Sequence, residues 1–263
     1  MSIPVSAAPA RYRGAVGELP VTALTSDSAA GSVVVVDGAG RWWDDAALAI
    51  SAGAAAIVVS RPAPAPAAGV ARLAGAPVVL ERPLLRPDTA SDVEAAQAAA
   101  PSASALVVEC HASAAELGAA LRDALGWVRQ LAPGAPALLS TAFADGRGTA
   151  LIDAGGGVTV SLVAGASAGA PPCGRIRATT LGETRLEVEL EEGDIRLTTT
   201  DAAFRRVWPT RFESAERIAL RRAAEAVRSG AMPSDLADYA RDSALAEAIW
   251  RRASDAGAEA STS

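Results

Sequence analysis

Few residues of this chain are of the types that carry out acid–base or metal chemistry. His111 is the only histidine, and no nucleophile–histidine–acid set can be assembled around it. A single histidine also cannot form the histidine cluster of a zinc site. We therefore expect His111 to be structural or to lie on the surface, with proton transfer as its weaker alternative.

Arg61, Trp42 and Trp43 are the residues best suited to bind a ligand. The arginine fork could hold a sugar hydroxyl or a carboxylate, although a salt bridge is the simpler role. Trp42 and Trp43 open a helix beside a glycine-rich loop, where a tryptophan could stack on a sugar or a nucleotide. Such a pair more often covers the end of a sheet or a subunit contact, and we favour that role.

All 24 basic residues are arginine, and the chain contains no lysine. A GC-rich genome accounts for most of this bias, because it favours arginine codons. The bias still has a chemical consequence. Arginine stays protonated at any working pH, whereas the pKa of a lysine can be lowered into the range that proton transfer needs.

The segment 32–62 would position the arginine and the two tryptophans. Val33 to Val36 form a β-branched run typical of a strand buried on both faces, and residues 56–59 form a second apolar strand. Residues 43–52 between them are rich in helix formers, and Gly53 stands where a helix-ending glycine belongs. Two buried strands joined by a helix form a βαβ unit, so the sequence predicts a parallel sheet.

This unit resembles the end of the Rossmann domain in the Gfo/Idh/MocA sugar-oxidoreductase family. The family signature is an Ala-Gly turn, a short apolar strand and Glu-Lys-Pro, and its last part corresponds here to Ser60-Arg61-Pro62. The resemblance implies that position 61 lies beside the sugar and the nicotinamide, with arginine in place of the lysine. A second alignment matches Glu-Lys-Pro to Glu81-Arg82-Pro83, where the lysine is again replaced by arginine.

A second family signature, whose histidine usually transfers the proton, resembles part of a predicted helix at 114–131. Its aspartate, glycine, histidine, second aspartate and tryptophan correspond in order to Glu116, Gly118, Ala120, Asp123 and Trp127. The histidine position is therefore an alanine, and Asp123 is expected to cap or pair on its helix. The resemblance implies vestigial catalytic positions at Arg61, Ala120 and Asp123.

Residues 1–31 lack the features with which a dinucleotide-binding domain opens. Such a domain begins with a strand, a Gly-x-Gly-x-x-Gly turn, a helix, a second strand and an acidic residue. None of these is recognisable here, and Gly14 and Gly17 are the only glycines before Gly31. We therefore predict an N-terminally truncated, incomplete Rossmann-like domain with no cofactor site.

The predicted fold class is an α/β domain at 1–112 followed by an α+β domain at 113–263. Short β-rich runs between residues 137 and 200, separated by turns such as Gly155 to Gly157, indicate an open, mainly antiparallel sheet. Thr210 to Glu213 is interpreted as a capping box that starts the final helices. The resemblance implies that these helices pack back on the first domain and that the open sheet packs face to face with a second subunit.

Composition excludes several classes of partner. The net charge of −6, with both signs interspersed, argues against nucleic acid. No apolar run reaches the roughly 18 residues of a membrane span, and the N-terminus does not resemble a signal peptide. Cys110 and Cys173 form no metal-binding spacing and are expected to be reduced thiols, so we predict a cytoplasmic protein without a metal site.

These observations lead to one main functional hypothesis and one alternative. The main hypothesis is a catalytically silent family member without a cofactor. It acts as an assembly or regulatory subunit, as a homodimer or with a full-length paralogue, through its open sheet. The alternative is a divergent oxidoreductase or lyase that acts on a sugar-like substrate through Arg61 and His111, with NAD or NADP bound in an altered way or with no nicotinamide cofactor.

Overall fold

The computed structural model describes residues 3–7, 9–19, 23–98, 103–191 and 194–260, with side chains up to residue 251. Within this part, the chain forms two compact units. Unit 1 comprises Met1–Pro83 and Phe212–Ala240, and unit 2 comprises Leu84–Arg211 and Arg241–Ser263. Each unit is therefore built from two separate stretches of the sequence.

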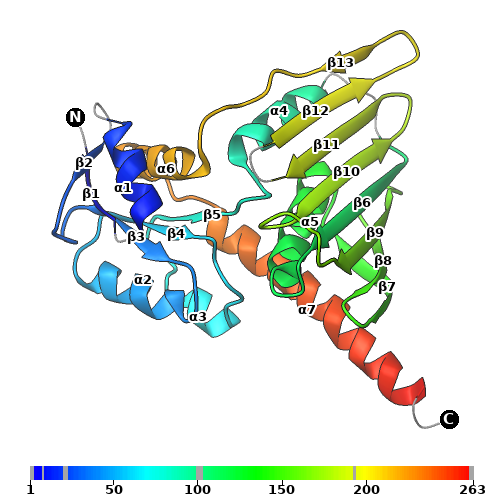
Figure 1. Ribbon diagram of the computed structural model, residues 1–263, viewed down its shortest axis with the longest axis horizontal. Helices are drawn as coiled ribbons and strands as arrows, with labels where there is room; N and C mark the ends of the chain where they lie inside the picture. The colour runs from blue at the N-terminus through cyan, green and yellow to red at the C-terminus, as the bar shows by residue number, and fades with distance from the viewer. Residues whose placement is uncertain (1–2, 8, 20–22, 99–102, 192–193, 261–263) are drawn as a thin grey trace. The chain divides into compact units, whose positions relative to one another are not determined.

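Unit 1 is a parallel sheet with helices on both faces (Figure 1). Its elements in chain order are β1 (Ile3–Ala7), α1 (Ala10–Gly17), β2 (Ala23–Thr25), β3 (Val33–Asp37), α2 (Trp42–Ser51), β4 (Ala56–Ser60), α3 (Ala67–Ala71), β5 (Val78–Glu81), α6 (Ala215–Ser229) and the first residues of α7 (Asp235–Ala260).

The strand order in unit 1 is β2-β1-β3-β4-β5, and every pair is parallel. A dinucleotide-binding sheet has the order 3-2-1-4-5-6. Within the described residues, the observed order corresponds to positions 2-1-4-5-6 of that arrangement, so the edge strand numbered 3 has no counterpart. The prediction of an incomplete Rossmann-like parallel sheet is confirmed.

The opening residues differ from the sequence prediction. β1, α1 and β2 form a strand–helix–strand unit, and β1 lies inside the sheet between β2 and β3. The expectation that this unit is missing is therefore wrong. The glycine-rich turn is nevertheless absent, because the residues that link β1 to α1 are Ala8 and Pro9.

The predicted βαβ unit is confirmed by β3, α2 and β4. Successive residues of β4 alternate between two cores, with Ala56 and Val58 on one face and Ile57 and Val59 on the other. α1 and α6 cover the first face, and α2 and α3 cover the second (Figure 1). Burial on both faces explains why β4 is a continuous apolar run.

Unit 2 is a large mixed sheet with helices packed against it. Its elements in chain order are α4 (Pro87–Ala98), β6 (Ala105–Ala112), α5 (Leu117–Leu131), β7 (Ala137–Ala144), β8 (Arg147–Asp153), β9 (Thr159–Ala166), β10 (Arg175–Leu181), β11 (Arg185–Glu191), β12 (Asp194–Thr200), β13 (Arg205–Val207) and the remainder of α7.

The strand order of the large sheet is β13-β12-β11-β10-β6-β9-β8-β7. Among the described strands of this sheet, β6 and β9 are the one parallel pair, which confirms the predicted mainly antiparallel sheet. The structure divides the chain differently from the expected domains at 1–112 and 113–263. The reason is that β6 pairs with β9 and β10 instead of joining the parallel sheet.

Helices cover only one face of the large sheet. α5 packs on β6, β9 and β10, and α4 packs on β12, on the same side of the sheet (Figure 1). No helix among the described residues of unit 2 covers the opposite face, which we call the open face. Along β8, β9 and β11, buried apolar residues alternate with more exposed residues on the open face.

The start of α6 also differs from the predicted capping box at Thr210 to Glu213. The N-cap is Ser214, whose hydroxyl accepts a hydrogen bond from the Arg217 backbone N–H at 3.4 Å. The helix ends at Gly230, which has a left-handed φ of 70°. Its apolar face contributes Ala219, Leu220, Ala223 and Ala224 to the core of unit 1.

Candidate functional site

The carboxyl-end edge of the parallel sheet is where a ligand of this fold would bind. Ser60 ends β4, Arg61 follows it, and Glu81 ends β5. α1 follows β1 at the same edge and brings Arg11 and Tyr12 toward these residues. The candidate site in unit 1 is therefore built around Glu81.

A buried polar cluster occupies this edge, formed by Arg11, Tyr12, Ser60, Glu81 and Glu216, which we call the Glu81 cluster. The Tyr12 hydroxyl donates a hydrogen bond to Glu81 Oε2 at 2.9 Å. Arg11 donates a hydrogen bond to the Ser60 hydroxyl and lies 3.5 Å from Glu81 Oε2 and 3.7 Å from Glu216 Oε1. The Glu81 side chain is only 2% exposed.

Burial dominates the electrostatics of the Glu81 cluster. It raises the pKa of Glu81 above the ordinary value of 4.5, although the Arg11 guanidinium and the Tyr12 hydroxyl act in the opposite direction. Burial, together with the Glu81 charge, also raises the pKa of Tyr12. Tyr12 therefore stays protonated, and its hydroxyl holds the Glu81 carboxylate in place by donating a hydrogen bond to it.

The raised pKa of Glu81 predicts how stability changes with pH. The folded protein holds this proton more tightly than the unfolded chain, so the free energy of unfolding falls as pH rises above 4.5 through the folded pKa. Glu81→Gln keeps an oxygen that accepts from Tyr12 but removes the titration. Urea unfolding between pH 4.5 and neutral pH should show a smaller fall in stability for Glu81→Gln than for the natural protein.

The exposed Glu183 provides the matched control for this prediction. Glu183→Gln makes the same change from carboxylate to amide at an exposed position and is measured alongside Glu81→Gln. A difference between the natural protein and Glu81→Gln that stays constant across the pH range would contradict the prediction.

Arg61 has a strained backbone at the same edge. Its φ of 51° lies in the left-handed region that non-glycine residues rarely adopt. The Arg61 N–H donates to the Glu81 carbonyl at 3.0 Å, and its Nε lies 3.9 Å from Glu81 Oε1. The side chain is 41% exposed, so it contacts the buried Glu81 and also reaches solvent.

Gly38 lets the loop between β3 and α2 pack closely against the backbone of Ser60 and Arg61. Its N–H donates to the Ser60 carbonyl at 2.8 Å, and its carbonyl accepts from the Ala63 N–H at 2.7 Å. A Cβ at Gly38 would lie 2.2 Å from the Ser60 carbonyl oxygen and 2.6 Å from the Arg61 carbonyl carbon. Only glycine fits between these two backbone segments.

Trp42 and Trp43 have structural contacts in unit 1. Trp42 is fully buried, its Nε1 donates to the Ala63 carbonyl at 2.9 Å, and its ring packs edge-on against Tyr239. It is therefore unable to stack on a ligand. Trp43 is half-buried and packs against Gly69, where a Cβ would lie 2.8 Å from its ring.

The second-signature residues of α5 support the start of unit 2. Asp123 Oδ2 accepts a hydrogen bond from the Leu84 N–H at 3.0 Å, and Trp127 Nε1 donates to the Leu84 carbonyl at 2.6 Å. Side chains of α5 therefore form hydrogen bonds with both the N–H and the carbonyl of Leu84. Ala120 is 1% exposed and lies in the apolar core. All three residues therefore have structural contacts within unit 2.

His111 lies near the end of β6, exposed on the open face of the large sheet. It stands opposite Arg175 of β10 and Gly165 of β9. His111, Ala120 and Asp123 belong to unit 2, whereas Arg61, Trp42 and Trp43 belong to unit 1. Within each unit, the structure gathers none of them into an acid–base pair.

The residues at the β1–α1 junction do not fit a dinucleotide pyrophosphate. Close approach of a pyrophosphate to this turn relies on glycines, and Ala7, Pro9 and Ala10 stand there instead. Pro9 at the N-cap has no N–H to donate. One feature that sequence reasoning missed is Asp27, which follows β2 at the point where an acidic residue contacts a ribose in such folds.

Other classes of site are not supported within the described residues. No group of three or more histidine, cysteine or acidic side chains there is arranged to hold a metal ion. None of the helices in those ranges has the length and apolar character that crossing a membrane requires. Cys110 is buried, and burial raises the pKa of its thiol, so it is unreactive.

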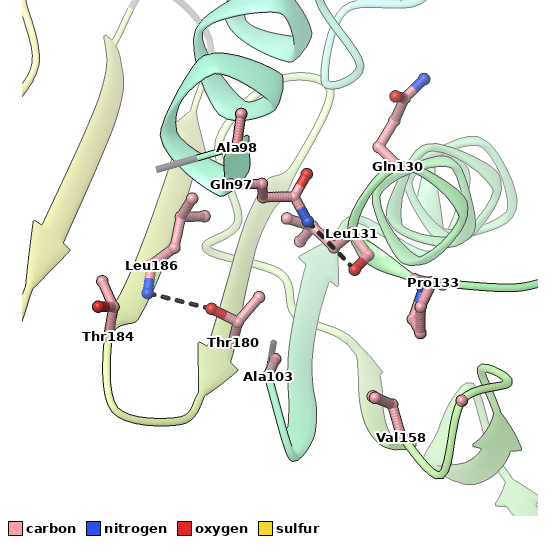
Figure 2. A pocket seen from close by; sticks show the side chains of 12 residues that line it. Gln97, Ala98, Ala103, Gln130, Leu131, Pro133, Val158, Thr180, Thr184 and Leu186 are labelled. Carbon is pink, nitrogen blue, oxygen red and sulfur yellow. Dashed lines mark hydrogen bonds between the residues drawn. The ribbon is translucent and has the colours of Figure 1, made fainter. Parts of the chain in front are cut away.

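A hollow of about 520 Å³ in unit 2 lies between the ends of α4 and α5 and the β10–β11 hairpin. Figure 2 shows two hydrogen bonds between residues that line it: Gln97 Nε2 donates to the Leu131 carbonyl at 3.3 Å, and the Leu186 N–H donates to Thr180 Oγ1 at 3.1 Å. It contains none of the predicted site residues. We therefore do not consider it a catalytic site.

Comparison with known proteins supports the fold. No protein-family model and no curated protein sequence matches the chain. A 3-ketoreductase from Actinomadura kijaniata, in complex with TDP-benzene and NADP, superposes with a TM-score of 0.70 and 14% identity, covering 95% of this chain and 97% of that chain.

A second similar structure is UDP-N-acetylglucosamine 3-dehydrogenase from Acidithiobacillus ferrooxidans, with a TM-score of 0.73 and 12% identity over 96% of this chain and 97% of that chain. Both superpositions span nearly the whole of the other chain, so they do not support the expected truncation. They show that this chain has the Gfo/Idh/MocA-like fold shared by sugar-modifying oxidoreductases.

Proposed function

We propose that this protein is a catalytically silent relative of the sugar-modifying oxidoreductases and acts as an assembly or regulatory subunit through its open face. One observation carries the proposal: the position that the family resemblance gives to the proton-transferring histidine is Ala120, buried in the core of unit 2. Removing a positioned proton donor lowers a rate by about 10²–10⁴.

The neighbouring signature residues support this interpretation. Asp123 and Trp127 both bond to the backbone of Leu84, so they have a structural role that is independent of catalysis. The two arginines that align with the signature lysine, Arg61 and Arg82, stay protonated and cannot replace a titrating lysine. Asp123 and Trp127 therefore contribute to the stability of unit 2, and proton transfer is not their role in this proposal.

The β1–α1 junction of unit 1, where a dinucleotide would be expected to bind, also supports catalytic silence. Glycines are absent at the β1–α1 junction, and Arg11 from the first turn of α1 is paired with Glu81 and Glu216. In a dehydrogenase of this fold the cofactor supplies the hydride and the protein supplies its orientation. Without a pyrophosphate site, this chain has no means of orienting a nicotinamide.

Titration with nicotinamide nucleotides tests the proposal, because the 3-ketoreductase neighbour was solved with NADP. Calorimetry of the pure protein with NADH and with NADPH should detect no binding tighter than about 1 mM, equivalent to roughly −4 kcal/mol. The 3-ketoreductase serves as the positive control. Micromolar binding of either nucleotide would refute catalytic silence and favour the divergent oxidoreductase.

The Asp27 carboxylate makes this titration more informative. An acidic residue at this point suits the ribose hydroxyls of NAD and repels the extra phosphate of NADP. If a nucleotide binds after all, NADH should bind more tightly than NADPH, and Asp27→Ala should reduce that preference. Co-purification from the native host then identifies a paralogous partner, if the subunit acts in a heteromer.

A further inference from the structure

The strand β13 forms one edge of the large sheet in unit 2. It pairs with β12 on one side and is the last strand in the sheet order (Figure 1). All three of its residues, Arg205 to Val207, are exposed. An edge strand has unpaired backbone groups along its outer side, so it is a template to which a further strand can be added.

The strand register shows which backbone groups of β13 face outward. The Trp208 N–H donates to the Leu197 carbonyl of β12 at 2.9 Å. In an antiparallel pair, every second residue directs its N–H and carbonyl groups at the neighbouring strand. The backbone of Arg206 therefore bonds to β12, whereas the N–H and carbonyl groups of Arg205 and Val207 point away from the sheet.

This edge is held in an extended conformation before a partner arrives. Asp201 fixes the turn that precedes it, because its Oδ1 accepts hydrogen bonds from the Ala203 N–H at 2.7 Å and from the Phe204 N–H at 3.0 Å. Trp208 follows the strand and packs against the core of unit 2. Since both ends are anchored, β13 loses little conformational entropy when a strand is added to it.

The arginines of β13 differ from those of the neighbouring strands. On β10, β11 and β12, every arginine forms an ion pair with a glutamate; these residues are Arg175, Arg177, Arg185 and Arg196. Within the described residues, Arg205 and Arg206 have no such carboxylate partner, although the whole chain carries a net charge of −6. The Arg206 guanidinium lies over the Trp208 ring, 4.4 Å from its centre. The edge therefore carries positive charge that the chain itself does not neutralise.

Apolar side chains lie beside these two arginines. Phe204, directly before the strand, is 61% exposed, and Val207 is 60% exposed. Side chains alternate between the two faces of a strand, so Arg205 shares one face with Val207, and Arg206 shares the other with Phe204. A complementary strand therefore needs two consecutive acidic residues opposite the arginines, with an apolar residue on either side of them.

We infer that β13 binds an extended acidic segment of another protein, which adds to the large sheet as a new edge strand. Backbone hydrogen bonds to Arg205 and Val207 provide the attachment, and the charges provide the selectivity. The same two arginines repel the β13 edge of a second copy, so the edge does not pair with itself. This inference concerns the sheet edge and does not depend on catalytic silence.

A short peptide with blocked termini, TTVEEVTT, tests the inference. Its order is palindromic, so the glutamates lie opposite the two arginines whether the added strand is parallel or antiparallel to β13. Fluorescence anisotropy with the natural protein should give a micromolar Kd. The matched peptide TTVKKVTT should bind at least about tenfold more weakly, because it places like charges together.

Three variants locate the binding on β13. Arg205→Glu replaces an attraction by a repulsion and should weaken binding of the acidic peptide at least about fivefold. Val207→Pro removes an N–H that points away from β12, so it should weaken peptide binding while urea unfolding stays cooperative. Arg147→Glu on β8 reverses a different exposed arginine and is the matched control, which should bind the peptide like the natural protein.

The inference is overturned if the natural protein binds the acidic peptide no more tightly than the lysine peptide. It is also overturned if Arg147→Glu weakens binding as much as Arg205→Glu, or if Val207→Pro retains full affinity, since the peptide then does not add as a strand. A single-stranded oligonucleotide that bound more tightly than the acidic peptide would assign the arginines and aromatic rings to nucleic acid instead. The nicotinamide titration is a separate measurement, so either idea can fail without the other.

Discussion

Gly38→Ala is expected to destabilise the protein by about 3 kcal/mol or more. The new Cβ would lie 2.2 Å from the Ser60 carbonyl oxygen and 2.6 Å from two Arg61 backbone atoms. These are backbone atoms, so no side-chain rotation relieves the clash. Urea unfolding followed by circular dichroism measures the change, at low temperature if the loss approaches the total stability of the protein.

Gly17→Ala is the matched control for this substitution. Gly17 also belongs to unit 1 and has nothing within 4 Å of a built Cβ. It should change the free energy of unfolding by no more than about 1 kcal/mol and in the stabilising direction, since alanine restricts the unfolded chain. Equal effects of the two substitutions would show that the chain does not pack closely at Gly38.

Trp127→Ala is expected to cost about 3–5 kcal/mol of unfolding free energy. The indole is fully buried in the core of unit 2, and its Nε1 holds the Leu84 carbonyl at 2.6 Å. Trp127→Phe keeps most of the ring but leaves that carbonyl without its donor, so it should cost about 1–3 kcal/mol. Denaturant unfolding monitored by circular dichroism would measure both losses.

The exposed Phe212 controls for the loss of an aromatic ring, because it is 92% exposed. Phe212→Ala should stay within about 0.5 kcal/mol of the natural protein. If Trp127→Ala cost no more than this, the contact between Trp127 and Leu84 would have no structural role in unit 2.

Segments with a strong local pattern were predictable from the sequence. The βαβ unit at 32–62 follows from two continuous apolar runs and a helix that ends at Gly53. The hairpin turn at Gly155 to Gly157 follows from three glycines, all of which have positive φ. In both cases the information lies within neighbouring residues.

The opening strand was missed because its pattern is weak. In β1, Pro4 and Ser6 alternate with the apolar residues Ile3 and Val5. Of the five residues of β1, only Ile3 and Val5 are buried. The sheet membership of β6 was missed for a different reason. An apolar strand can join either sheet, and the choice of β9 and β10 as partners depends on pairing with residues far away in the sequence.

The candidate site was only partly predictable. Arg61 was identified from the sequence, but the Glu81 cluster brings together residues from positions 11 to 216, and no local pattern encodes that convergence. One signal was available: acidic Glu81 ends an apolar strand, and strand ends meet at one edge of a parallel sheet.

The division of unit 1 between two stretches of sequence has a consequence for synthesis on the ribosome. α6 supplies Ala219, Leu220, Ala223 and Ala224 to the same core as β1, β3 and β4. A nascent chain that has not yet reached Ala215 therefore lacks α6 and exposes to water the part of that face that α6 covers. Translation must pass through all eight strands of unit 2 before the N-terminal unit can be completed, so a chaperone that shields apolar strands should bind the emerging chain during this interval.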